Sequence, residues 1–188
     1  MKLYKAYLEA NIADEIKIKK FIRVAGAVIM KEDEESGEKK ILLIQRAADD
    51  HFPLMYEIPR GKCDGGDSGD KNEKLIDCLK RETKEECGLD IEPVQFIDEF
   101  SYIADNGTRK STQYNFLCEM KNPNQEVKLS FEHDSFLWVT SVGQVEMMVM
   151  PEIKKTISKI FNTDKEIVSY PYNPEEEDTI EEYLKVIQ

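Results

Sequence analysis

The chain has 188 residues, of which 40% are hydrophobic and 34% charged, and its formal net charge is −12. This length suits one domain with a sizeable core and is short for two. The negative charge repels extended nucleic acid and anionic membranes, so it favours a small substrate that is bound with the help of cations or local arginines. The sequence has no apolar run long enough to cross a bilayer and no leader pattern, and we therefore expect a cytoplasmic protein.

The four cysteines show no paired metal-type spacing, and two of them fall within a predicted helix. They are Cys63, Cys78, Cys87 and Cys118. Reduced thiols are the simpler expectation for such a set.

The first part of the chain is predicted to form β structure after an N-terminal extension of residues 1–21. Residues 21–31 and 41–46 are short, apolar and rich in Ile, Leu and Val, and a polar turn separates them. This pattern predicts two paired strands. Residues 56–58 are predicted to form a brief third strand that leads to Pro59.

A helix is predicted over about residues 72–87. Its inner stripe holds four side chains at intervals of three and four, namely Leu75, Ile76, Leu79 and Thr83. Another face carries Glu82, Glu85 and Glu86, which form one anionic patch because residues three and four apart share a face. Like charges at these spacings destabilise an isolated helix, so the patch indicates either a solvated surface or a bound cation. Gly88 is predicted to end the helix as its C-terminal cap.

After this helix the pattern alternates strands with one further helix. Strands are predicted near residues 94–103, 113–120 and 135–140. The second helix is predicted over residues 151–161, with Pro151 at its first position. Strands with two helices on one sheet system predict an α/β/α sandwich. The acidic residues 163–188 are predicted to form a tail with one short helix.

Six residues around the first predicted helix match a known signature. They follow the order Glu, seven residues, Arg-Glu-x-x-Glu-Glu-x-Gly, and are Glu73, Arg81, Glu82, Glu85, Glu86 and Gly88. This spacing resembles the signature of the Nudix hydrolases, and stretches over residues 22–161 resemble that family in the same order. The resemblance implies a Nudix hydrolase domain over residues 22–162, a Nudix-type α/β/α sandwich with a mixed sheet and a catalytic loop-helix, and a MutT-like nucleotide pyrophosphohydrolase.

Two positions depart from the family pattern. The signature normally opens with a glycine six residues before its first glutamate, where this chain has Asp67. Gly61 is the better match, which leaves an insertion of about six residues within Cys63–Asp70, a length that an exposed loop tolerates. Thr83 stands where the family usually has an aliphatic residue, and we expect only a mild effect on packing.

The glutamates are suited to bind a divalent cation. Cleaving a phosphoanhydride needs positive charge at the phosphoryl oxygens and a water made nucleophilic at neutral pH. Hard cations prefer oxygen ligands, and the family resemblance implies the same positions. Mg²⁺, with Mn²⁺ as a substitute, is therefore expected at Glu82, Glu85, Glu86 and the backbone carbonyl of Gly61. Glu73 and Arg81 are expected to orient these ligands by charge-assisted hydrogen bonds, with an ordinary surface pair as the alternative.

The general base is left open between two parts of the chain. Glu85, beside Glu82, is placed to bind the metal and polarise the attacking water. Glu132 lies shortly before Trp138, where some Nudix enzymes look similar and contribute a distal acid. His133 could titrate near neutrality, but a loop hydrogen bond explains it at least as well, so His133 is not assigned.

The predicted substrate contacts are arginines and aromatic residues near strand ends. Phosphate contacts are predicted at Arg46, Arg60 and Arg109, and stacking on a base at Phe52 or Tyr56. Each of these residues is equally well explained as strand-end charge or as a core aromatic.

The predicted reaction is Mg²⁺-dependent cleavage of a nucleoside diphosphate linked to another moiety, with a nucleoside triphosphate or a dinucleoside polyphosphate favoured. Residues 52–59 resemble nucleoside triphosphate pyrophosphohydrolases, and the lack of proline within residues 101–110 argues weakly against ADP-ribose pyrophosphatases. The alternatives are hydrolysis of capped RNA or a nucleotide sugar, isomerisation of a diphosphate ester, and an inactive nucleotide-sensing domain. The resemblance also suggests a homodimer, and neither a membrane nor extended nucleic acid is expected as a partner.

Overall fold

The computed structural model describes residues 18, 20–33, 35–50, 52–66, 72–145 and 149–161. Most of the predicted N-terminal extension and the whole predicted tail with its short helix lie outside these residues. The same is true of residues 67–71, which include part of the predicted insertion. Those parts of the domain division therefore stay predictions.

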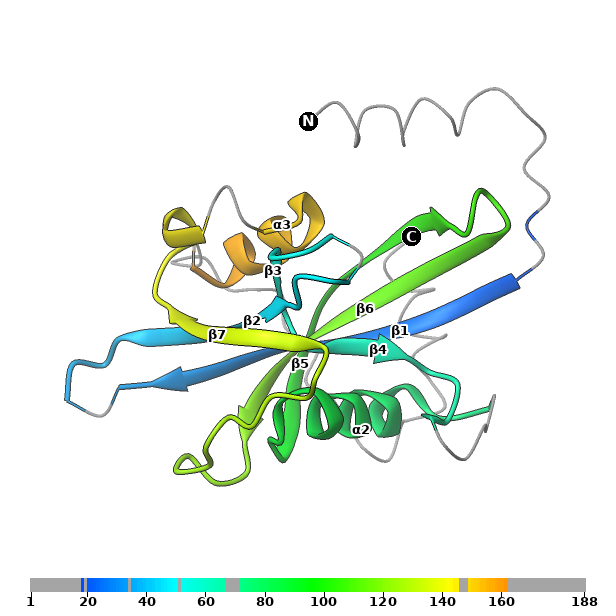
Figure 1. Cartoon of the computed structure of the whole chain (residues 1–188). Coiled ribbons are helices and arrows are strands. Elements are labelled where there is room, and N and C mark those ends of the chain that lie inside the picture. Colours follow the sequence, from blue (N-terminus) through cyan, green and yellow to red (C-terminus); the bar gives the residue numbers. More distant parts are fainter. Residues whose placement is uncertain are drawn as a thin grey trace.

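The described part of the chain forms seven strands, two α-helices and one short 3₁₀ helix (Figure 1). Their bounds are β1 Lys20–Glu32, β2 Lys39–Arg46, β3 Tyr56–Glu57, β4 Arg60–Lys62, α2 Leu75–Cys87, β5 Ile91–Ala104, β6 Arg109–Met120, β7 His133–Val139, η2 Val142–Val145 and α3 Pro151–Phe161. Neither helix of these described ranges has the length and apolar character that crossing a bilayer requires.

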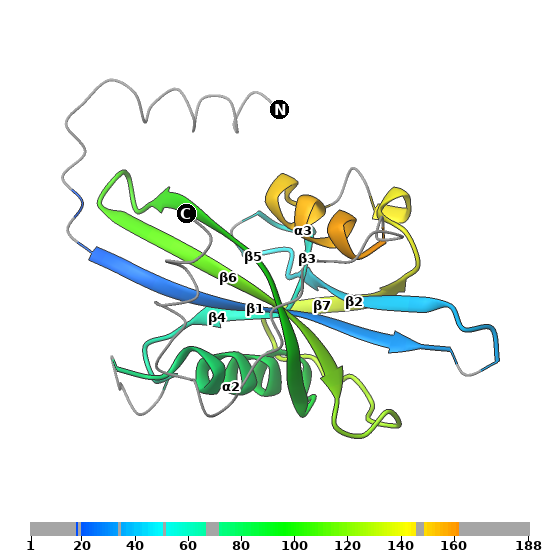
Figure 2. The same ribbon diagram turned by 180° about the vertical axis from the view of Figure 1, so that it is seen from behind.

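The strands form one mixed sheet of order β3-β2-β1-β6-β5, in which β4 also pairs with β1 and β7 with β2. β1 and β6 run parallel, and the other paired strands are antiparallel. β1 pairs with β2 over Met30, Lys31 and Glu32. An earlier part of β1, Val24–Gly26, pairs with β4 instead, so β4 lies between β1 and α2 (Figure 2).

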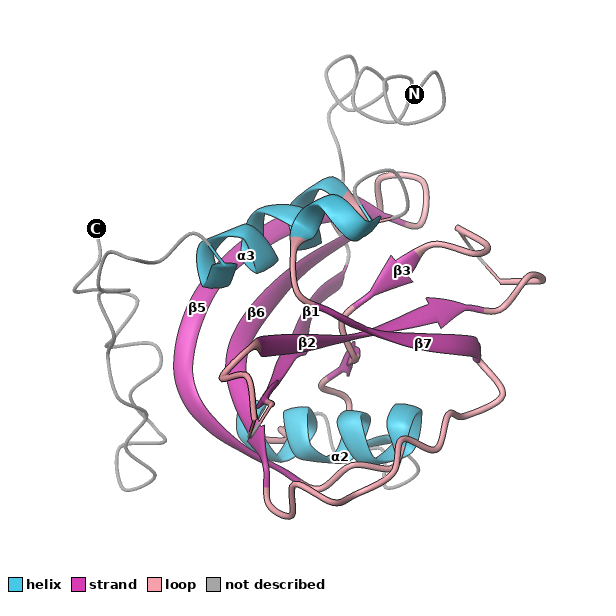
Figure 3. Cartoon of the chain, turned by 90° about the vertical axis from the view of Figure 1, so that its left-hand side faces the viewer, coloured by secondary structure: helices cyan, strands magenta, loops and turns pink. Residues whose placement is uncertain are grey.

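One helix covers each face of the sheet, with α2 on one side and α3 on the other (Figure 3). Ala25 and Ile29 of β1 lie in the core on the α2 side, together with Leu79. Val28 of the same strand lies in the core on the α3 side, together with Ile153. Successive side chains of a strand point to opposite faces, so β1 supplies both cores. The predicted α/β/α sandwich with a mixed sheet is confirmed.

α2 is held by its inner stripe and by its C-terminal cap. The predicted stripe is buried as expected, and Thr83, the departure from the family pattern, is 1% exposed. Gly88 adopts the left-handed conformation, with φ 72°, and its N–H donates to the Lys84 carbonyl, which is the C-cap geometry that glycine favours. The helix begins at Leu75, about three residues later than its pattern suggested.

Two elements were not predicted from the sequence. β4 is only three residues long and has no apolar alternation; it forms because Val24–Gly26 of β1 offers it backbone partners. η2 is a single turn between β7 and α3. The predicted strands are all present, and β5 and β6 extend beyond their predicted bounds because they pair with each other along most of their length.

The expectation of reduced thiols is wrong for two of the four cysteines. Cys63, just after β4, and Cys78, in the first part of α2, form a disulfide with their Cα atoms 5.1 Å apart. They are 15 positions apart in the sequence, and the packing of β4 on α2 brings them together. Cys87 and Cys118 are free and buried. Burial raises the pKa of the Cys87 thiol to about 12 and the pKa of Cys118 further, so both are unreactive thiols.

Candidate active site

Arg81 gathers three carboxylates at the surface of α2. Its guanidinium donates two hydrogen bonds to Glu73, of 2.7 and 2.8 Å, one to Glu82 of 2.8 Å and one to Glu85 of 3.0 Å. A further bond of 3.1 Å reaches the Lys62 carbonyl of β4. The hydrogen bond from Arg81 lowers the pKa of Glu73, and the same contact raises the pKa of Arg81. The structure thus brings together the two residues predicted to orient the site and two of the predicted metal ligands.

Gly61 lies directly against Glu82. A Cβ atom built on Gly61 would stand 1.8 Å from the carboxyl carbon of Glu82, so no side chain fits here without a shift of the backbone or of the glutamate. Gly61 is held there because β4 pairs with β1, with Gly61 opposite Ala25. The close approach puts the backbone of β4 beside the acidic face of α2.

Glu86 points under β4 and is nearly buried. Its side chain accepts a hydrogen bond of 2.7 Å from the backbone N–H of Arg60. Burial raises its pKa well above the ordinary value, and the neighbouring carboxylate of Glu57 adds to that effect. Burial likewise raises the pKa of Glu82. Burial thus disfavours the charged form of both carboxylates, and a bound cation would favour it.

The chemistry of this donor set fits a hard divalent cation. Glu82, Glu85 and Glu86 offer carboxylate oxygens, and β4 offers backbone carbonyls within the same small region. In the arrangement seen here the carboxylates are bonded to Arg81 and to the Arg60 N–H, and no three His, Cys, Asp or Glu side chains of the described residues already stand as a metal-binding group. Glu85 is 56% exposed, so its side chain is the one with most freedom to turn toward a cation.

Glu57 is a central residue that the sequence interpretation missed. It is 1% exposed and lies between Arg46 and Arg60, with oxygen–nitrogen distances of 2.5 and 2.7 Å. Burial opposes its ionisation, but the charges of Arg60 and Arg46 and a contact with His133 outweigh burial and lower its pKa to about 2. A glutamate inside a short apolar strand, between two arginines in sequence, was the available signal.

Two of the three predicted phosphate-binding arginines are fixed by this carboxylate. Arg60 bonds Glu57 and also donates to the Gln113 side-chain oxygen at 2.8 Å. Arg46 bonds Glu57 and Asp50. Both guanidinium groups are thus rigidly oriented, and Arg60 is joined through its own N–H to Glu86.

Arg109 lies away from the other predicted site residues. It pairs with Asp105 at the start of β6. Five residues along the same strand, Tyr114 stands opposite Ala25, which is the partner of Gly61. At roughly 3.3 Å per residue, this puts Arg109 about 16 Å along the strand from the region of Gly61.

The remaining predicted residues differ in exposure. Phe52 is 58% exposed and has φ 59°, a backbone conformation that a bulky residue rarely adopts without a functional or structural reason. Tyr56 is buried, and its hydroxyl lies 3.3 Å from Ser135 Oγ, so it is a core residue and not a free stacking surface. Glu132 is exposed, in the turn before β7.

His133 is buried beside Glu57 with both ring nitrogens lacking a hydrogen-bond partner among the described residues. Its Nε2 lies 3.7 Å from a Glu57 oxygen. The loop hydrogen bond at this residue comes from its backbone N–H, which donates to the Ser130 carbonyl at 3.3 Å, and not from its ring. The turn that carries His133 and Glu132 is tied to α2, because the Ser130 N–H donates to the Glu86 carbonyl.

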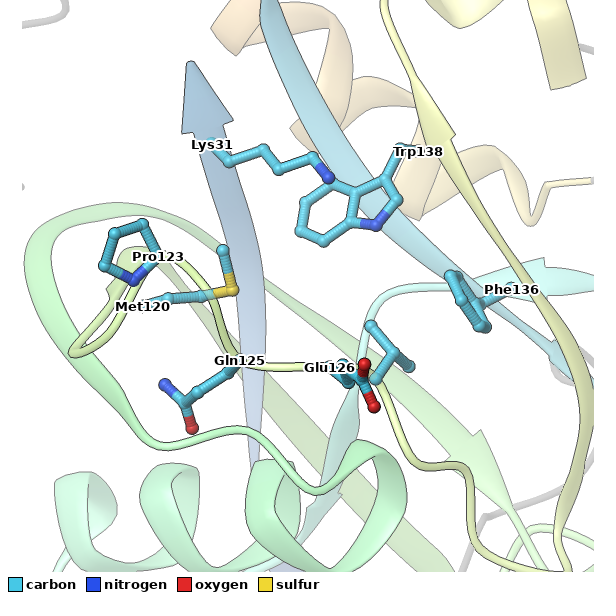
Figure 4. A pocket seen from close by; sticks show the side chains of 8 residues that line it. Lys31, Met120, Pro123, Gln125, Glu126, Phe136 and Trp138 are labelled. Atoms are coloured by element: carbon cyan, nitrogen blue, oxygen red, sulfur yellow. The ribbon is translucent and has the colours of Figure 1, made fainter. Parts of the chain in front are cut away.

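A pocket of ≈ 360 Å³ lies near the C-terminal end of α2 (Figure 4). Phe136 and Trp138 of β7 form one side, and the loop after β6 forms another. The Lys31 Nζ lies 3.9 Å from the centre of the Trp138 ring, and burial, together with Lys40, lowers the pKa of Lys31. None of the residues predicted to bind substrate lines this pocket.

Comparison with known proteins agrees with this architecture. The NUDIX domain model matches residues 20–159 of the chain. The bis(5'-nucleosyl)-tetraphosphatase (asymmetrical) of Mus musculus is 26% identical over 124 residues, which cover 64% of this chain and 77% of that protein. The mRNA-decapping enzyme subunit 2 of Saccharomyces cerevisiae is 39% identical over 90 residues, which cover 48% of this chain but only 8% of that protein.

Solved structures share the fold. The crystal structure of a C. elegans Ap4A hydrolase binary complex superposes with a TM-score of 0.58 at 23% identity, over 74% of this chain and 94% of that one. The family model covers well over half of the sequence, including all of the signature residues. The chain therefore belongs to the Nudix hydrolase family, which confirms the prediction of a pyrophosphohydrolase drawn from its glutamate signature.

Proposed function

We propose that the protein is a Mg²⁺-dependent hydrolase of a nucleoside diphosphate linked to another moiety, with dinucleoside polyphosphates and nucleoside triphosphates as the favoured substrates. The observation that carries the proposal is the acidic face of α2 pressed against the backbone of Gly61. Support for the substrate class comes from the mouse relative, whose name describes a dinucleoside tetraphosphatase.

The predicted site residues would have distinct roles in this reaction. Glu82, Glu85, Glu86 and the Gly61 carbonyl would hold Mg²⁺ or Mn²⁺, which supplies charge neutralisation at the phosphoryl oxygens and activation of water. Arg81, fixed by its two bonds to Glu73, would orient Glu82 and Glu85 before a cation binds and would stay beside the site when these carboxylates turn to the cation. Glu85, the most exposed of the three, and Glu132 are the candidates to accept the proton of the attacking water.

Arg46 and Arg60 would bind the substrate phosphates. Their shared bond to the buried Glu57 fixes both guanidinium groups before any substrate arrives, which lowers the cost of ordering them on binding. The net charge of −12 makes such local cations necessary, since the chain as a whole repels polyphosphates. Phe52 would offer a stacking face, and Arg109 lies too far along β6 to share this role with the same phosphates.

A second candidate substrate is capped RNA. The observation in its favour is the 39% identity to the yeast decapping enzyme. The acidic charge of the chain argues against a long RNA, and the match spans a small part of that enzyme. Capped RNA therefore belongs among the substrates that are tested and is not the favoured one.

The test is product formation from a panel of dinucleoside polyphosphates, nucleoside triphosphates, nucleotide sugars and capped RNA, with and without Mg²⁺. Glu85→Gln is compared with Glu99→Gln, a matched change at an exposed position on β5. We expect Mg²⁺-dependent cleavage that falls at least about 100-fold in Glu85→Gln and persists in Glu99→Gln. Nucleotide binding without any cleavage by the unaltered protein would overturn the proposal and leave the sensing domain.

A further inference from the structure

The Cys63–Cys78 disulfide joins the two elements that supply the proposed cation site. Cys63 follows Gly61 by two residues, directly after β4. Cys78 lies in α2 four residues before Glu82, and residues four apart in a helix share a face. The Cys78 sulfur lies 3.8 Å from the Gly61 carbonyl oxygen. One covalent bond therefore lies beside both the Gly61 carbonyl and Glu82 of the proposed cation site.

Among the described residues, two hydrogen bonds also join β4 to α2 near this point. The backbone of β4 is fixed to β1, and the Cys63 N–H donates to the Arg23 carbonyl. Toward α2 the neighbouring contacts are the Arg81 bond to the Lys62 carbonyl and the Arg60 N–H bond to Glu86. The second of these bonds uses Glu86, a ligand of the proposed cation site, and a cation that draws Glu86 away would weaken it. The disulfide is a covalent attachment that such a rearrangement leaves intact.

The segment between the two cysteines contains the predicted insertion relative to the family signature. A longer segment restrains the positions of its two ends less, so a covalent bond between those ends has a larger effect. Glu73 lies within it and accepts hydrogen bonds from the Gly65 N–H and from Arg81. Closing the segment at its ends thus holds Glu73 near Arg81 as well as Gly61 near Glu82.

We propose that the Cys63–Cys78 pair is a redox-sensitive positioning clamp, which holds the Gly61 carbonyl and Glu82 at cation-binding separation when oxidised and releases them when reduced. The inference rests on the proposed function, since it concerns the same cation site. The two cysteines are positioning residues and touch neither substrate nor the reacting atoms.

The opening reaction is an exchange with a dithiol. Cys78 is fully buried and Cys63 is 7% exposed, so a thiolate of the dithiol attacks the Cys63 sulfur. The bond between the two protein sulfurs breaks, and the Cys78 sulfur leaves as a thiolate that takes up a proton. The second thiol of the reagent then displaces Cys63 as a thiol. Two electrons pass to the protein, and the dithiol becomes a disulfide.

The experiment measures Mn²⁺ binding to the full chain by electron paramagnetic resonance, without substrate, before and after treatment with dithiothreitol. Thiol titration in denaturant should find two thiols before treatment and four after it. We expect the dissociation constant for Mn²⁺ to rise about tenfold on reduction and to recover on reoxidation. Half-maximal hydrolysis should need correspondingly more cation, with kcat at saturating cation changed less than about twofold.

Two variants separate the clamp from general effects of the reagent. Cys63→Ser/Cys78→Ser should bind Mn²⁺ as weakly as the reduced protein, with or without dithiothreitol. Cys118→Ala, a change at a free buried thiol, should keep the full response to reduction. Circular dichroism of the reduced protein and of the double variant should retain the spectrum of the oxidised protein.

The outcomes are distinguishable. Equal Mn²⁺ affinity in both redox states, with hydrolysis intact, would overturn the clamp and leave the proposed function standing. Loss of the circular dichroism spectrum on reduction would also overturn it, since the bond would then be a general staple of the fold. No Mn²⁺ binding and no hydrolysis in either state would overturn the proposed function and the clamp with it.

Discussion

Glu82 occupies the space that a Cβ atom on residue 61 would need, so glycine is the residue that fits at this position. Gly61→Ala must push β4 away from α2 or turn Glu82, and we expect hydrolysis to fall about 100-fold, as for a displacement of roughly 1 Å at a reacting centre. The free energy of unfolding should fall by about 1–3 kcal/mol. Rates and urea midpoints measure the two effects.

Gly143→Ala is the control for this substitution. A Cβ atom there would have its nearest neighbour, the Ser141 hydroxyl, at 3.9 Å, which is an ordinary contact. We expect both rate and stability to stay near those of the unaltered protein. A Gly61→Ala protein with full activity would show that the close approach of β4 to Glu82 has no catalytic role.

Glu57 stabilises the fold in a way that depends on pH. Its pKa is lowered to about 2 in the folded protein, so its contribution is present above the ordinary carboxyl pKa and is lost as the pH falls toward 2. The shift corresponds to about 3 kcal/mol near neutrality, of which about 2 kcal/mol is lost by pH 3. The free energy of unfolding of Glu57→Gln should therefore be well below that of the unaltered protein at pH 6. This difference between the two proteins should be smaller at pH 3.

Urea unfolding at the two pH values measures this difference, with Glu99→Gln as an exposed control. The control should differ little from the unaltered protein at either pH. If the loss in the free energy of unfolding for Glu57→Gln is the same at pH 6 and pH 3, the two arginines do not give the buried carboxylate a net stabilisation.

At the scale of elements, the C-terminal cap of α2 requires glycine at residue 88 for two reasons, its backbone conformation and the lack of space for a side chain. Gly88 has φ 72°, and a Cβ atom there would meet Lys128 Cβ at 3.1 Å and the Lys128 carbonyl oxygen at 3.3 Å. Gly88→Ala should cost about 1 kcal/mol for the backbone conformation and a further amount for displacing the loop at Lys128. We expect a total loss of about 2 kcal/mol in the free energy of unfolding.

Gly37→Ala isolates the conformational part of this cost. Gly37 has φ 67°, and the nearest neighbour of its Cβ atom would be a Glu32 side-chain oxygen at 3.7 Å. Urea unfolding should show a loss of about 1 kcal/mol for this variant alone. Equal losses in the two variants would show that the loop at Lys128 yields freely to the added methyl group.

Elements that form because of residues within their own segment could be predicted from the sequence, whereas features that depend on contacts between distant segments could not. α3 was predicted to the residue because Pro151 and the apolar spacing after it are local signals. The acidic face of α2 was predicted for the same reason. β4, the Cys63–Cys78 bond and the pairing of Glu57 with its arginines were missed, because each depends on segments that meet only when the sheet forms.

For the whole molecule, the charge of −12 should oppose the approach of a polyphosphate. Screening by salt weakens long-range repulsion more than it weakens contacts within the site. With Mg²⁺ held at saturation, we expect kcat/KM to rise about two- to fivefold between roughly 20 and 200 mM monovalent salt, with kcat nearly constant. Steady-state kinetics on the substrate identified by the panel measure this, and a fall in kcat/KM would mean that local arginines dominate the approach of substrate.

The parallel pairing of β1 with β6 also bears on the order of folding. Lys20 stands opposite Arg109 and Met30 opposite Glu119, so a loop of almost ninety residues must close before these strands meet. Both β4 and α2 lie inside that loop. Contacts so distant in sequence are slow to form, whereas α2 can form helical turns on its own much sooner. On refolding, helical signal should therefore return before activity, because the catalytic surface is complete only when the two ends of the domain have found each other.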